Sequence, residues 1–141
     1  MMNLKRKMKS KGDFVLREKV IDFLIFIGIT EPEKDGLLDL IIKNVSYKVL
    51  NETNTVLPMA EGLESIAVYM AIGEYLSFKK TSGQLENIDL ETAVKQIQQG
   101  DTNIQYAIGE GSQTPEQRLD NLITMLLDRE NELIKFRRLV W

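Results

Sequence analysis

The sequence of 141 residues contains no histidine and no cysteine. Histidine is the usual general base, and with cysteine it is a frequent ligand of transition metals. Cysteine also supplies thiolate nucleophiles and disulfides. Most catalytic constellations and the common zinc sites are therefore excluded, and we expect no enzyme, no cofactor and no metal site.

Proline and glycine are also scarce, with 3 and 9 residues, and long hydrophobic runs are missing. The longest apolar run, residues 23–29, is far shorter than the roughly 20 residues that span a bilayer. Hydrophobic residues make up 43% and charged residues 28% of the chain, as in ordinary globular proteins. We expect one folded domain that does not enter a membrane.

The charge is divided unevenly along the chain, although the net charge is only -3. Residues 1–12 carry five basic side chains and no acidic one, which leaves 13 basic and 21 acidic residues, or -8, for residues 13–141. We expect a basic N-terminal arm (1–12) followed by one domain (13–141). The arm could contact nucleic-acid phosphates, but no aromatic residue is interleaved, so a solubilising terminus is the favoured interpretation.

Apolar residues at helical spacing predict helices over about 13–27, 31–50, 59–78 and 114–134. The third of these contains small residues that would let a neighbouring helix approach closely. They are Ala67, Ala71, Gly73 and Ser77. The sequence therefore predicts a mainly α-helical protein, a small bundle of about four helices.

Local signals predict where these helices begin and end. Gly28 is suited to end the first helix in a left-handed conformation. Thr30 with Glu33 predicts a capping box for the second helix, and Thr114 with Gln117 predicts one for the last, with Pro115 between them.

One short β-hairpin-like element is expected around residues 94–108. Residues 90–99 fit either a helix or a strand, whereas the alternating apolar residues after the Gly-Asp turn favour a strand over 102–108. A strand with an unpaired edge is a site for strand addition by another chain. The residues expected to contact a neighbouring subunit are Gly100, Asp101, Ile104, Tyr106 and Ile108.

The C-terminal segment, residues 135–141, combines basic and aromatic side chains on an otherwise acidic chain. Cations are favourable at the end of a helix, so the charges alone need no function. Arginine and tryptophan are nevertheless enriched at interface hot spots, which favours docking to a partner over folding back onto the bundle. The predicted docking residues are Lys135, Phe136, Arg137, Arg138, Leu139, Val140 and Trp141.

The run IQQGDTNIQYAIGEG, the capped helix after it and the ending LIKFRRLVW resemble the head-tail connector, or head-completion, proteins of tailed phages and prophages. The Gly100-Asp101 turn, Ile104, Tyr106 and the segment 136–141 carry this resemblance, which covers roughly residues 30–141.

The resemblance implies a structural virion protein without catalytic groups or cofactors. Such a protein assembles in the bacterial cytoplasm and forms a closed ring of about twelve copies in the neck of the virion. The ring binds the portal protein, receives the next neck or tail protein and extends the DNA channel, and an acidic body suits DNA that must slide without sticking. The alternative is a nucleic-acid-binding regulatory protein that uses the basic arm, which would show salt-sensitive binding.

Overall fold

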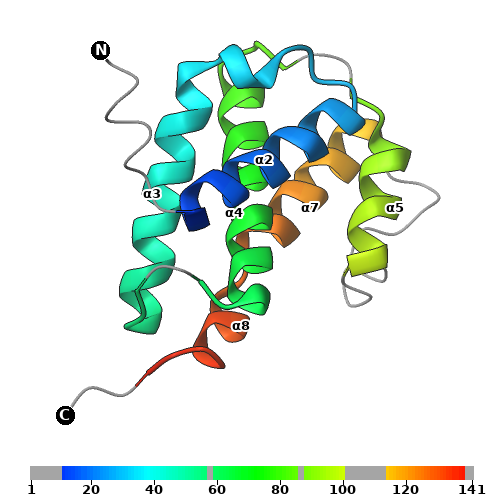
Figure 1. The fold of residues 1–141 in the computed structure, drawn as a ribbon. Coiled ribbons are helices and arrows are strands. Elements are labelled where there is room, and N and C mark those ends of the chain that lie inside the picture. The colour runs from blue at the N-terminus through cyan, green and yellow to red at the C-terminus, as the bar shows by residue number, and fades with distance from the viewer. Residues whose placement is uncertain (1–10, 57–58, 86–87, 101–113, 139–141) are drawn as a thin grey trace, which may run out of the picture.

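The computed structural model describes residues 11–56, 59–85, 88–100 and 114–138, and all regular structure in these ranges is helical (Figure 1). The prediction of a mainly α-helical protein is confirmed. The elements are α2 (Lys11–Phe26), the 3-10 turn η1 (Pro32–Lys34), α3 (Gly36–Thr53), α4 (Glu61–Thr81), α5 (Leu90–Gly100), α7 (Pro115–Leu127) and α8 (Glu130–Ile134). Helix α2 begins at Lys11, inside the range assigned to the basic arm.

Helix α4 is the central element, because α2, α3, α7 and α8 all pack against it (Figure 1). It is apolar around most of its circumference, as a helix surrounded by neighbours must be. Gly73 on α4 is buried, and a Cβ added there would lie 2.9 Å from Leu126 Cβ on α7. The predicted close approach of a helix to these small residues is therefore confirmed at Gly73.

The core is formed by the apolar faces of the helices around α4. The side chains that are almost wholly buried include Leu16, Leu24, Ile27, Leu38, Leu63, Ile72, Leu76, Leu122 and Leu126. Burial of a side chain of this size stabilises the fold by roughly 1.5–3 kcal/mol relative to exposure. The helical spacing seen in the sequence is thus the pattern of residues that face this core.

Of the two signals predicted between residues 28 and 33, the helix end is confirmed and the helix start is wrong. Gly28 ends α2 with φ 107°, as predicted. The capping box expected at Thr30 is wrong: Glu31 takes a left-handed φ of 48°, and the next residues form the short turn η1. The cap of α3 is Asp35, whose side chain accepts a hydrogen bond from Leu37 N at 3.0 Å.

The capping box at the start of α7 is confirmed. The Thr114 hydroxyl accepts from Gln117 N at 3.2 Å, and Gln117 Oε1 accepts from Thr114 N at 3.0 Å. Pro115 occupies the first helical position, where its missing N–H has no intrahelical partner.

The single helix predicted over 114–134 is broken into α7 and α8. Asp128 leaves the helical region with φ -85° and ψ 81°, and α8 starts after Arg129. Arg129 is only 2% exposed, with its guanidinium 4.9 Å from the centre of the Tyr69 ring and Nη1 3.1 Å from Glu132. The break turns α8 toward α3 and buries Leu133.

The hairpin-like element is not seen. Residues 94–100, expected to include its first arm, belong to helix α5, and the predicted strand 102–108 lies outside the described residues. Asp89 opens α5, because its carboxylate accepts from Thr92 N at 3.0 Å and from the Thr92 hydroxyl at 2.5 Å. The hydrogen bonds from Thr92 lower the pKa of Asp89. The apolar spacing of residues 90–99 fits either a helix or a strand, and the cap at Asp89 favours the helix.

Candidate partner-docking surface

The C-terminal segment returns to the end of α3 after leaving α8 (Figure 1). Arg138 N donates to Thr53 O at 2.7 Å, and Asn54 Nδ2 donates to Arg138 O at 2.9 Å. Both hydrogen bonds involve the backbone of residue 138. The chain is therefore fixed to its own bundle up to this residue.

Asn54 both ends α3 and holds the C-terminal segment. Its φ of 55° lies in the left-handed region, which asparagine tolerates better than most residues. Thr53 beside it is fully buried, and its hydroxyl donates to Val49 O at 2.7 Å. The polar residues at the end of α3 thus also form the contact for residue 138.

Phe136 packs against the bundle. Its ring is half-buried, and a Cβ added at Gly62 on α4 would lie 2.7 Å from Phe136 Cζ. Glycine at position 62 therefore makes room for the ring. We call this packing, together with the two hydrogen bonds of residue 138, the C-terminal contact.

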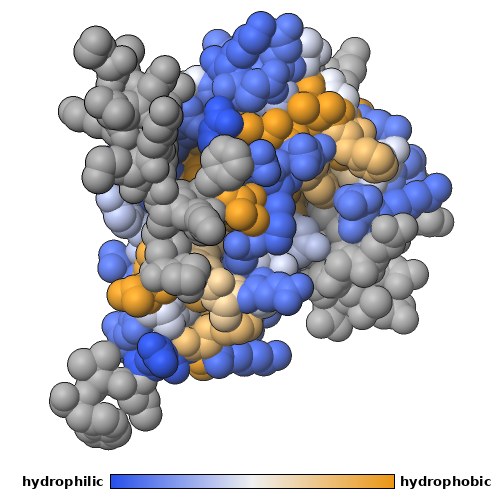
Figure 2. All heavy atoms as spheres, in the orientation of Figure 1, coloured by the Kyte–Doolittle hydropathy of each residue, from blue (hydrophilic) through white to orange (hydrophobic). Residues whose placement is uncertain are grey.

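The remaining described residues of the predicted docking set are exposed. Lys135, Arg137 and Arg138 form no ion pair with any side chain that the structure describes. The two elements that meet here also expose apolar side chains, Ile134 on α8 and Val56 after α3, the latter 76% exposed. Hydrophilic and apolar side chains interleave over this lower end of the molecule in Figure 2. Residues Leu139, Val140 and Trp141 lie outside the described ranges.

The residues expected at an inter-subunit contact are not brought together by the described part of the chain. Gly100 is the last residue of α5. Asp101, Ile104, Tyr106 and Ile108 lie outside the described residues.

A polar cluster between α3 and α4 was not anticipated from the sequence. Asp35 Oδ2 accepts from Tyr75 Oη at 3.0 Å and lies 2.7 Å from Lys79 Nζ. Burial alone would raise the pKa of Asp35, but the hydrogen bonds from Lys79, the Leu37 amide and Tyr75 outweigh it and lower the pKa. The spacing of Tyr75 and Lys79, one helical turn apart, was the available signal.

This cluster links the start of α3 to α4 through a hydrogen bond and an ion pair. It borders a hollow of about 100 Å³ at the start of α3. The Asp35 carboxylate already receives three hydrogen bonds, so three of its roughly four acceptor sites are used by contacts within the fold. No group of acidic side chains in the described ranges is arranged to hold a metal ion.

Comparisons of the chain with protein families, with curated proteins and with solved structures found no match. In the part of the chain that the structure describes, no helix has the length and apolar character needed to cross a membrane.

Proposed function

We propose that the chain is a structural protein of the phage neck, which forms a ring on the portal and links the DNA-filled head to the tail. The resemblance of residues 100–106 and 136–141 to head-tail connector proteins supports this proposal, and so does the helical fold that the resemblance implies. A structural role also suits a chain without histidine or cysteine.

The structural observation that carries the proposal is the exposed cationic end of the bundle. Lys135, Arg137 and Arg138 lie on a segment whose backbone is already fixed by the C-terminal contact. A fixed backbone reduces the entropy that docking must overcome. In the proposed complex these cations pair with portal carboxylates, and Leu139, Val140 and Trp141 supply apolar contacts.

The packing of Phe136 on Gly62 refines the predicted docking set. In this proposal Phe136 positions the C-terminal segment on its own bundle, and the exposed side chains around it meet the portal. The segment from Gly100 to Ile108 contacts the neighbouring copy in the ring, and the acidic body lets DNA pass without specific recognition.

The test is to mix the purified protein with portal rings, image the mixture, and measure the affinity. We expect coaxial stacked rings, with binding weakened by about thirtyfold for each of Arg137→Glu and Arg138→Glu. Lys48→Glu, an exposed cation on α3 outside this surface, is the matched control and should bind as the original chain does.

Two results would contradict the proposal. One is portal affinity that does not change in either arginine variant. The other is salt-sensitive binding of the isolated chain to duplex DNA with no binding to portal rings, which would favour the nucleic-acid-binding regulator instead.

A further inference from the structure

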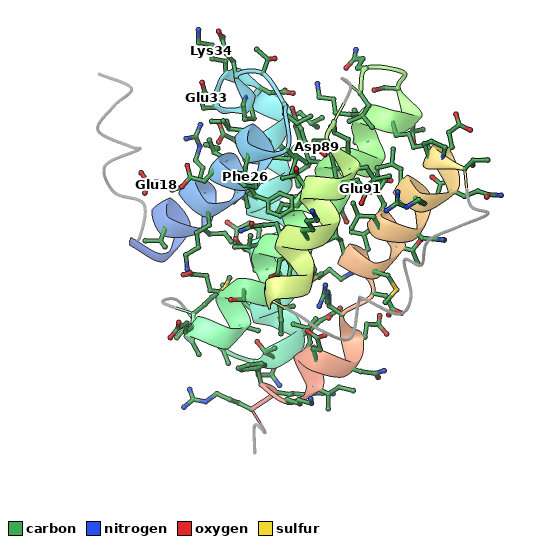
Figure 3. The ribbon with its side chains drawn as sticks, turned by 90° about the vertical axis from the view of Figure 1, so that its right-hand side faces the viewer. Glu18, Phe26, Glu33, Lys34, Asp89 and Glu91 are labelled. Carbon is green, nitrogen blue, oxygen red and sulfur yellow. The ribbon has the colours of Figure 1, made fainter. Side chains whose placement is uncertain are left out.

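A groove of about 370 Å³ lies between α2, α4 and α5. Its apolar part is formed by Phe23 and Phe26 of α2 and by Val68 and Tyr69 of α4, and Gln96 of α5 faces it. Phe26 is 62% exposed and lies beside α5 in Figure 3. A groove of this size, with aromatic walls, is comparable with sites that receive side chains of a ligand.

The charged side chains that line the groove are one basic residue, Lys19, and one acidic residue, Asp22. Glu18 lies one turn before Asp22 on the same helix (Figure 3 labels Glu18). Neither carboxylate forms an ion pair with a described side chain, whereas Lys19 between them is paired with Glu64. The groove therefore combines an apolar floor with unpaired negative charge at its edge.

Residues 1–10, which lie outside the described ranges, have the complementary composition. They carry Lys5, Arg6, Lys7 and Lys9 without any acidic residue, and their apolar side chains are three methionines and Leu4. Methionine is flexible and polarizable, so it fills irregular apolar grooves well. Basic side chains among methionines match an aromatic groove that has unpaired carboxylates, Asp22 and Glu18, beside it.

The length of this segment is sufficient to reach the groove. Helix α2 rises by about 22 Å from Lys11 to Phe26 at 1.5 Å per residue. Nine extended residues before Lys11 span up to about 30 Å. A chain that turns back at Lys11 can therefore run along α2 as far as Phe26.

We propose that residues 1–10 fold back along α2 of the same chain and dock in this groove. The methionine and leucine side chains cover Phe23 and Phe26, and the basic side chains lie beside Glu18 and Asp22. The segment then shields an apolar surface that would otherwise be open to other proteins. This role is independent of the neck function proposed above.

The absence of cysteine allows a direct test by disulfide trapping in the full-length chain. The probe variant combines Met2→Cys with Gln96→Cys on the groove wall. The matched control combines Met2→Cys with Glu74→Cys, an exposed residue of α4 that does not line the groove. Under copper–phenanthroline oxidation, we expect the probe to form an intramolecular disulfide at least tenfold faster than the control.

Groove substitutions in the probe background provide the second measurement. Asp22→Lys and Phe26→Ser should each slow the crosslink about tenfold, and 0.5 M salt should slow it as well. Phe78→Ser, at a phenylalanine that is also more than half exposed but does not line the groove, should not slow it. Circular dichroism checks that each variant is folded. Equal rates in probe and control, rates that no groove variant changes, or disulfide-linked dimers in place of monomers would each overturn the proposal.

Discussion

The Asp35 carboxylate joins the start of α3 to α4 through three interactions. It caps α3 through Leu37 N and receives Tyr75 Oη and Lys79 Nζ from α4. Hydrogen bonds that favour its ionised form outweigh the effect of burial, so its pKa in the folded protein lies below the ordinary 3.8. Its charge therefore contributes to the stability of the fold.

Replacement of this carboxylate by an amide should reveal the contribution as a function of pH. Asparagine at position 35 can still cap the helix, so the loss in Asp35→Asn is mainly that of the charged contacts to Lys79 and Tyr75. We expect a loss of about 1–2 kcal/mol in the free energy of unfolding at pH 7, measured by urea denaturation.

The sign of the pH dependence follows from the lowered pKa. A carboxyl whose pKa is lower in the folded state contributes fully above the unfolded value of 3.8, and the contribution disappears as the pH falls through the folded pKa. The difference between Asp35→Asn and the original chain should therefore shrink at pH values below 3.8. A difference that is the same at pH 7 and at pH 3 would show that the charge does not stabilise this cluster.

At the scale of elements, the approach of α7 to α4 depends on one missing side chain. A Cβ at position 73 would lie 2.9 Å from Leu126 Cβ and 3.0 Å from Leu127 Cγ. Leu126 Cβ is attached directly to the helix backbone, so it cannot move without moving α7. Glycine is thus required here by the distance between helices, although it weakens the helix itself.

Gly73→Ala tests these two opposing effects. Alanine gains about 1 kcal/mol in helix propensity, but the close contact costs about 1–3 kcal/mol. We expect a net loss of stability, measured as a lower melting temperature. Gly36→Ala is the matched control, because a Cβ at position 36 would meet no atom within 4 Å. A Gly73→Ala protein that melts above the original would show that α7 can shift to accommodate the methyl group.

Elements whose ends are determined by neighbouring residues were predicted well from the sequence. The capping box at Thr114 and Gln117 and the left-handed Gly28 both involve residues within a few positions of each other. The second helix was expected to start near Thr30 because Thr30 and Glu33 have the spacing of a capping box. Asp35 is the N-cap of α3 instead, and its carboxylate is stabilised by Tyr75 and Lys79, about forty residues later.

Interactions between distant residues account for the other differences. The break between α7 and α8 places Arg129 on Tyr69, sixty residues earlier, and no local helix breaker marks it. The packing of Phe136 on Gly62 joins residues that are even further apart in the sequence. The basic and aromatic character of the C-terminal segment was visible in the sequence, whereas the contact that fixes it was not.

For the molecule as a whole, the C-terminal contact fixes the backbone of the segment that carries Lys135, Arg137 and Arg138. Asn54 provides a substitution that affects this contact alone. Glycine adopts the φ of 55° at position 54 without strain, so α3 should end at the same place in Asn54→Gly. The substitution removes the hydrogen bond to Arg138 O. We expect the melting temperature of the bundle to change little, with less than about 0.5 kcal/mol in stability.

The expected local effect of Asn54→Gly is faster hydrogen exchange at the Arg138 amide, which donates to Thr53 O in the intact contact. If the neck proposal holds, the affinity for portal rings should also fall several-fold, because the segment is less well ordered before binding. Asn51→Gly, on the same end of α3, is the comparison variant. An Arg138 amide that exchanges at the original rate would show that Asn54 does not hold the segment.

The contact at residue 138 uses backbone atoms of the C-terminal segment and no side chain of Arg138. The path of the segment along the bundle therefore does not depend on which side chains occupy the exposed positions of the segment. Mutations at positions 135, 137 and 138 can accumulate without disturbing the path of the segment. If the segment docks to a partner as proposed, point substitutions at these positions could change which partner it recognises, while Thr53, Asn54 and Gly62 keep the path of the segment constant.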